Sequence, residues 1–229
     1  MLDLPSVAFK KSVGMRTLPT AYGSRFGRAL AYTEATHRMQ VRKGSNVPYI
    51  GHLLGVASIV IDNGGTEDEA IGALLHDAAE DQGGQLRLDD IAREFGQRVS
   101  DIVAGCSDSI TADPTQKAPW LDRKLTYLKH LADDNDESVM LVSVADKTHN
   151  LRSMLADYVA VGEALWSRFS AKKVGTIRYY RSLLDVYEHR REPKVRHIAK
   201  SLRETLQSLE LLSGAKEMSE LADGRGLSR

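Results

Sequence analysis

The sequence has little sulfur, no net charge and no long apolar run. Its 229 residues include one cysteine, Cys106, which excludes a disulfide framework and a cysteine-rich zinc module and favours a reducing compartment. The 31 Lys and Arg residues balance the 31 Asp and Glu residues, so an anionic partner must be met by a local group of cations. No segment approaches the ~20 consecutive apolar residues that span a bilayer. We therefore expect neither a membrane nor a nucleic acid as partner.

The N-terminal segment also lacks the order of a secretory signal. Its basic residues follow the short apolar stretch, whereas in a signal peptide they precede it. We therefore expect a soluble, cytoplasmic protein. Residues 1–22 contain prolines and a glycine but little periodicity, and are expected to form an irregular leader. Residues 213–229, which are small and charged, are expected to form a frayed C-terminal tail.

Strand-like alternation is missing as well, and helical periodicity takes its place. Only residues 139–144 approach a β-branched run, and no internal repeat is present. Residues 108–119 form a polar loop of a length that is often functional. We predict an all-α fold with one domain over residues 23–212. Its helices are expected near residues 24–37, 52–61, 66–81, 88–95, 99–106, 120–131, 138–158, 164–189 and 194–212.

The strongest candidate for chemistry is the hexapeptide His-Asp-Ala-Ala-Glu-Asp at residues 76–81, at the end of an apolar segment. Glu80 lies four residues after His76, and Asp81 lies four residues after Asp77, so ionisable groups stack at one helix end. Three acids and a histidine in that place disfavour folding unless a cation compensates them. The alternative is a solvated helix end, although acids at a helix C-terminus oppose the helix dipole.

Two further polar residues interrupt apolar segments. His52 begins the most apolar helix of the chain, and Asp146 follows the apolar run of residues 139–145. Each has a simpler interpretation when it is taken alone, as a core histidine or as a local pair with Lys147. Taken jointly, two imidazoles and two carboxylates from three helices suit a divalent metal such as Mn²⁺, Fe²⁺ or Zn²⁺. This donor set consists of His52, His76, Asp77 and Asp146.

Three segments resemble the HD superfamily of metal-dependent phosphohydrolases. They are RKG with PYIGH at residues 42–52, LLHDAAED at residues 74–81 and ADKTHNLR at residues 145–152. More narrowly, residues 23–190 resemble the hydrolase domain of RelA/SpoT-type alarmone enzymes. Long members of that family also carry a synthetase domain and regulatory domains. Since this chain ends too soon for those domains, we expect a stand-alone small alarmone hydrolase.

The resemblance implies an HD helical bundle around a single metal site. It implies that Glu80 and Asp81, one turn beyond the metal ligands, activate and orient the attacking water. It also implies one Mn²⁺ ion per chain, held by His52, His76, Asp77 and Asp146.

The same resemblance places a nucleotide beside the metal. Arg42 and Lys43 match residues at the mouth of the nucleotide site, and Asn150 and Ser153 match polar positions that line it. Spacing agrees, because Asn150 lies four residues after Asp146 and Ser153 follows three residues later on the same helix face.

These roles imply hydrolysis of the 3′-pyrophosphate of (p)ppGpp or (p)ppApp to GDP or GTP, or ADP or ATP, with release of pyrophosphate. One alternative is another HD phosphohydrolase that acts on a 5′-nucleotide, a dNTP or a cyclic dinucleotide. A second alternative is a non-catalytic nucleotide-sensing module, although such a module needs no group of buried charges. The base preference, the physiological metal and any homo-oligomer stay open at this point.

Residues 165–176 depart from the long alarmone enzymes. Tyr179 and Tyr180 could contact a base and Lys172 and Lys173 a phosphate, but core tyrosines and solvated lysines are the favoured interpretation. His149 is expected to be structural. Lys124, which follows Arg123 near the 108–119 loop, could reach the substrate, but an exposed helix face is the favoured interpretation.

Overall fold

The computed structural model describes residues 22–111, 113–133 and 136–215, so residues 1–21 of the predicted leader and residues 216–229 of the predicted tail lie outside the described residues. The elements are α1 (Ser24–His37), α2 (Ile50–Asp62), α3 (Glu67–Leu75), α4 (Ala78–Asp81), α5 (Gly84–Phe95), α6 (Gln97–Cys106), the 3₁₀ turn η1 (Pro114–Gln116), α7 (Trp120–Asp133), α8 (Glu137–Val161), the 3₁₀ segment η2 (Gly162–Arg168), α9 (Lys172–Glu188) and α10 (Pro193–Ser213). Within these residues no strand forms beyond one isolated bridge between Val41 and Pro48. The predicted all-α fold is confirmed.

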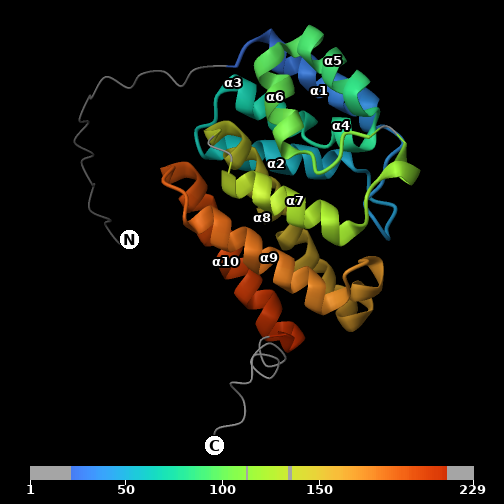
Figure 1. Cartoon of the computed structure of the whole chain (residues 1–229), viewed down its shortest axis with the longest axis vertical. Helices are drawn as coiled ribbons and strands as arrows, with labels where there is room; N and C mark the ends of the chain where they lie inside the picture. The colour runs from blue at the N-terminus through green and yellow to red at the C-terminus, as the bar shows by residue number, and fades with distance from the viewer. Residues whose placement is uncertain (1–21, 112, 134–135, 216–229) are drawn as a thin grey trace, which may run out of the picture.

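Helix α8 is the central element of the bundle. It packs against α2, α3, α6 and α10, and Figure 1 shows α1 and α3–α6 on one side of it and α9 and α10 on the other. Asp136 caps its N-terminus by accepting hydrogen bonds from the backbone N–H groups of Ser138 and Val139. Residues 138–146 are buried all round, which explains the apolar run in the sequence. The buried half of α8 therefore carries Asp146 into the interior.

Helices α2 and α3 form the other wall of that interior. The predicted capping box is present, because Thr66 accepts from the backbone N–H of Glu69 and the Glu69 carboxylate accepts from the backbone N–H of Thr66. A close approach of α3 and α6 depends on Gly72, where a Cβ atom would lie 2.7 Å from Cγ2 of Ile102. These contacts fix the C-terminal end of α3, where the His-Asp pair follows.

The helix predicted over residues 66–81 is wrong in one respect, since it is broken in the middle. Helix α3 ends at Leu75, His76 and Asp77 form a turn, and α4 begins at Ala78. Asp77, the N-cap of α4, has φ −95° and ψ −3°, which is still within the right-handed helical region. The turn points both side chains to the same side of the backbone, toward α2 and α8.

The helix predicted over residues 164–189 is interrupted too. Segment η2 ends at Arg168, and α9 begins at Lys172, whose φ of 53° is left-handed. Other bounds shift by a few residues, the largest shift being the start of α5 at Gly84. The single-domain limits of 23 and 212 stay predictions.

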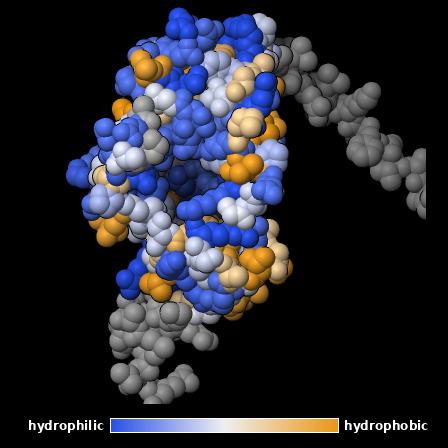
Figure 2. Space-filling view, turned by 90° about the vertical axis from the view of Figure 1, so that its right-hand side faces the viewer, coloured by the Kyte–Doolittle hydropathy of each residue, from blue (hydrophilic) through white to orange (hydrophobic). Residues whose placement is uncertain are grey.

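One side of the molecule is hollowed. Figure 2 shows this hollow surrounded mainly by hydrophilic surface, on the side where Figure 1 places the 42–49 segment and the start of α7. Among the described helices, none combines the length and apolar character that crossing a membrane requires.

Candidate functional site

Four side chains from three helical segments converge in the interior. His52 lies in the first turn of α2, His76 and Asp77 follow α3, and Asp146 lies in the buried half of α8. His52, His76 and Asp146 are buried and offer donor atoms within 4.8 Å of one another. Asp77 completes the group with its Oδ2 atom 3.0 Å from His76 Nε2 and 3.5 Å from His52 Nε2.

The distances within this group fit a single divalent ion. Asp146 Oδ1 lies 3.2 Å from His52 Nε2 and 3.5 Å from His76 Nε2. Two ligands that are each about 2.1 Å from one ion lie about 3.0 Å apart at octahedral angles and about 3.4 Å apart at tetrahedral angles. The Nε2 atoms of both histidines are buried and have no hydrogen-bond donor or acceptor at proper geometry. Such orphaned lone pairs are unfavourable unless a cation receives them, so the residues form a candidate metal site.

The Nδ1 atoms of both imidazoles, which face away from the group, are each within hydrogen-bond distance of another residue. His76 Nδ1 lies 2.8 Å from the backbone oxygen of Ala73, to which it donates, so that its Nε2 lone pair faces the group. His52 Nδ1 lies 2.9 Å from Nδ1 of His149. Burial and the neighbouring His52 and Arg42 lower the pKa of His149 to about 4, which keeps this ring neutral at physiological pH. His149, expected to be only structural, therefore contacts a candidate ligand.

The two carboxylates are also held by neighbouring side chains. The Tyr49 hydroxyl donates to Asp77 Oδ2 at 2.6 Å. Asn150 Nδ2 donates to Asp146 Oδ1 at 2.6 Å, and Lys147 Nζ donates to Asp146 Oδ2 at 2.5 Å. The pair between Asp146 and Lys147 is thus present but largely buried, not on the surface.

The electrostatic field of these four side chains favours a positive charge at their centre. Burial by itself raises the pKa of the Asp146 carboxyl, but Lys147 and the two imidazoles outweigh burial and hold it well below its usual range. Burial likewise lowers the pKa of His76, yet Asp77 and Asp146 raise it well above its ordinary value. Two carboxylates that stabilise a proton on a buried imidazole also stabilise a cation in its place.

Glu80 and Asp81 have different surroundings in α4. Burial, followed by the charges of Asp108 and Asp77, raises the pKa of Glu80 to about 7. Asp81 is exposed and accepts a hydrogen bond from Gln40 Nε2 at 2.7 Å. A carboxyl group that titrates near neutral pH suits proton transfer, so Glu80 has the properties of an acid–base residue. Roles for both acids stay predictions.

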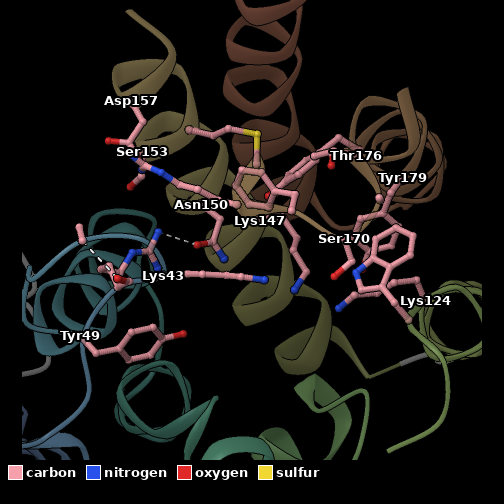
Figure 3. A pocket seen from close by; sticks show the side chains of 18 residues that line it. Lys43, Tyr49, Lys124, Lys147, Asn150, Ser153, Asp157, Ser170, Thr176 and Tyr179 are labelled. Atoms are coloured by element: carbon pink, nitrogen blue, oxygen red, sulfur yellow. Dashed lines mark hydrogen bonds and ion pairs between the residues drawn. The ribbon is translucent and has the colours of Figure 1, made fainter. Parts of the chain in front are cut away.

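Beside this group lies a cavity of about 320 Å³. In Figure 3, the side chains of Lys43, Lys124 and Lys147 point into the same space from the 42–49 segment, α7 and α8, respectively. Its cationic residues outnumber its one acid, Asp157. The cations are Arg42, Lys43, Lys124, Lys147 and Arg168, and the aromatic residues are Tyr49, Trp120, Phe169, Tyr179 and Tyr180.

All four residues that the family resemblance assigned to the nucleotide line this cavity. Arg42 Nη2 donates to Asn150 Oδ1 at 3.0 Å, and Ser153 Oγ donates to the backbone oxygen of His149. Lys43 is exposed and makes no hydrogen bond or ion pair with any of the described residues. Their binding roles stay predictions, but their common location is an observation.

A second wall of the site includes Lys124, for which the favoured exposed-face interpretation is wrong, and Lys117, which sequence reasoning missed. Lys117 and Arg123 lie 3.6 and 3.5 Å from Glu80 Oε1, and Lys124 donates to Asp108 Oδ2 at 2.5 Å. The signal that could have indicated it is an Arg-Lys pair on a helix that follows a polar loop.

Of the residues after α8 that the sequence singled out, some line the cavity and others do not. Tyr180 is buried and Tyr179 is half-buried, and both line the cavity. Lys172 is exposed, whereas Lys173 donates to Glu163 and to the backbone oxygen of Ser213. The solvated-lysine interpretation therefore holds for Lys172 and is wrong for Lys173.

Comparison with known proteins identifies the family. The model of the HD domain matches residues 29–177. The chain belongs to the HD domain family. Its HD domain contains the group of His52, His76, Asp77 and Asp146, and the resemblance seen in the three motifs is confirmed.

Two curated relatives and one solved structure illustrate the similarity of this HD domain. A protein of Xenopus tropicalis named guanosine-3′,5′-bis(diphosphate) 3′-pyrophosphohydrolase MESH1 is 37% identical over 129 residues, 55% of this chain and 67% of the relative. A probable GTP pyrophosphokinase of Mycobacterium leprae is 31% identical over 138 residues, 59% of this chain but 16% of the relative. A structure described as a metazoan ortholog of SpoT that hydrolyzes ppGpp has a TM-score of 0.63, with 22% identity over 83% of this chain and 96% of that chain. This structure supports the fold alone.

Proposed function

We propose that this HD-domain protein is a metal-dependent pyrophosphohydrolase that removes the 3′-pyrophosphate of (p)ppGpp or (p)ppApp. The products are pyrophosphate and GDP or GTP, or ADP or ATP. One observation carries the proposal: Tyr49, Lys147 and Asn150 each hold a carboxylate of the candidate metal group and also line the cationic cavity. A substrate in the cavity therefore lies next to the metal group.

The charge of the cavity matches a polyphosphorylated nucleotide. Lys43 has no carboxylate partner among the described residues, whereas Lys124 and Lys147 are each paired with a buried acid. Such a concentration of cations in a chain of zero net charge selects a polyanion. Aromatic residues on the same walls offer apolar surface to a base. The name of the Xenopus relative supports the 3′-pyrophosphate as the group removed.

The residues of the site divide the work. We infer that Mn²⁺ is held by His52, His76, Asp77 and Asp146, where it supplies Lewis-acid catalysis and activation of water. Glu80, whose pKa is about 7, accepts the proton of the attacking water.

Around these groups, Lys147 neutralises charge on the departing pyrophosphate. Asn150 orients Arg42 toward the phosphates through the 3.0 Å hydrogen bond. Asp81 orients the water.

The partner that we propose is the nucleotide substrate. A homo-oligomer is compatible with this function. The single cysteine suits the cytoplasm.

Product analysis tests this function. Protein loaded with Mn²⁺ is incubated with ppGpp, ppApp and dGTP, and the products are separated by anion exchange. We expect the wild type to release pyrophosphate and a nucleoside diphosphate from one or both alarmones, and His76→Ala to release neither product. Turnover should be unchanged in the control variant His189→Ala, because His189 is exposed and lies at the end of α9. The proposal is overturned if the protein hydrolyses dGTP but neither alarmone, or if His76→Ala keeps full activity.

A further inference from the structure

A second histidine lies behind the candidate ligand His52. Nδ1 of His149 is 2.9 Å from Nδ1 of His52, and the two ring centroids are 4.9 Å apart. His149 lies on α8, three residues after Asp146, whereas His52 lies on α2. One turn of α8 therefore provides a carboxylate of the group and touches an imidazole that another helix provides.

The hydrogen bond between these rings has one direction that suits metal binding. His52 must keep its Nε2 lone pair for a cation, so its proton is on Nδ1. That Nδ1–H then donates to Nδ1 of His149, which accepts and carries its own proton on Nε2. The tautomers of both rings therefore follow from this contact together with metal binding by Nε2 of His52.

Gly55 makes room for this arrangement. It lies on α2 three residues after His52, and a Cβ atom at this position would be 2.2 Å from Nε2 and 2.3 Å from Cδ2 of His149. Any larger residue would force the His149 ring to move away from His52. The α2 backbone and the His149 ring therefore fit together only because residue 55 has no side chain.

We propose that His149 is a positioning residue for the metal site, which fixes the tautomer and the ring orientation of His52, and that Gly55 provides the space it needs. This proposal rests on the candidate metal group and not on the identity of the substrate. Loss of a hydrogen-bond partner of this kind lowers metal affinity about 10- to 100-fold.

Two substitutions of His149 separate the hydrogen bond from the packing of the ring. Asn has an oxygen at the same distance along the side chain as Nδ1, whereas Leu has a methyl group there and nearly the same shape as Asn. Mn²⁺ affinity is measured by calorimetric titration of metal-free protein, without nucleotide. We expect His149→Leu to bind Mn²⁺ at least about 10-fold more weakly than wild type, and His149→Asn to stay within about threefold.

Substitution of Gly55 tests the same idea from α2. Gly55→Ala should weaken Mn²⁺ binding about as much as His149→Leu does, because the new Cβ displaces the ring. Gly51→Ala is the matched control, since a Cβ at this position on the same helix meets no atom within 4 Å. When Gly55→Ala and His149→Leu are combined, the two losses should not add, because no imidazole is left for the new Cβ to displace.

Circular dichroism and the thermal midpoint of each metal-free variant show whether the bundle is intact. Should His149→Leu fail to fold, the comparison of Gly55→Ala with Gly51→Ala decides. Wild-type Mn²⁺ affinity in His149→Leu or in Gly55→Ala overturns the proposal, and so does an equal loss in His149→Asn and His149→Leu. Since no nucleotide is present, these outcomes are independent of whether alarmones are the substrate.

Discussion

Replacement of Glu80 by Gln should stabilise the metal-free protein at alkaline pH while it abolishes turnover. The Glu80 side chain is 21% exposed. Burial and the charges of Asp108 and Asp77 raise its pKa from the ordinary 4.5 to about 7, although Lys124 and Lys117 oppose this shift. The folded protein therefore disfavours the ionised form of a residue that we propose to act as a base.

The magnitude follows from proton linkage. Between the unfolded pKa of about 4.5 and the folded pKa of about 7, the native state binds more protons than the unfolded state. The free energy of unfolding therefore falls as the pH rises through this window. Integrated from about pH 5.5 to about pH 8, this difference is ~2 kcal/mol. Gln does not titrate, so wild type should lose about 2 kcal/mol more than Glu80→Gln over this interval.

Urea unfolding followed by circular dichroism measures this effect, with a chelator present and at both pH values. Glu94→Gln on α5, where the side chain is 48% exposed, is the control for the Glu-to-Gln change itself. An equal difference between Glu80→Gln and wild type at both pH values would refute the reasoning. Stabilisation with loss of activity is the trade-off expected of a residue selected for function.

Three other perturbations test the metal, the cavity and the packing. Removal of metal by a chelator should lower the thermal midpoint of unfolding, since a ligand at 100 times its Kd stabilises the folded state by ~2.7 kcal/mol. A thermal midpoint that is the same with and without Mn²⁺ contradicts the candidate metal site. Lys147→Met removes the lysine partner of the buried Asp146 carboxylate and a cation from the cavity, so kcat/KM in steady-state assays should fall about 100-fold or more, and a change below about threefold contradicts the role of Lys147. Gly72→Ala places a Cβ 2.7 Å from Ile102 and should lower the free energy of unfolding by ~1–3 kcal/mol with KM unchanged; full stability in urea unfolding contradicts the close approach of α3 and α6.

The all-α fold could be predicted because its signals are local. Thr66 and Glu69 form the capping box that their spacing indicates, and the apolar run before Asp146 is buried as its composition requires. The break at His76 and Asp77 could not be predicted in this way, because neither Gly nor Pro marks it. It places both side chains against α2 and α8, and these contacts are absent from any local window of sequence.

The convergence of the candidate metal group could be predicted for a different reason. A polar residue such as Asp146 within an apolar segment is unfavourable unless something compensates it, so the sequence itself indicates that a partner exists. The Arg123-Lys124 pair beside a polar loop is a weaker signal, because a lysine on an amphipathic helix has the same pattern whether it faces water or a cavity. Its partner Asp108 is 16 residues away along a polar loop, and only the path of that loop brings the two together.

One turn of α8 shows why roles are assigned by contacts and not by residue type. Asp146 belongs to the candidate metal group, and Lys147 next to it donates to the Asp146 carboxylate and also lines the cavity. His149 touches His52, and Asn150 connects Asp146 to Arg42. Positions three and four residues apart share a helix face, so spacing alone groups these side chains. The contacts with His52 of α2 and with Arg42 of the 42–49 segment distinguish these residues from one another, and they connect the candidate metal group directly to the cationic cavity.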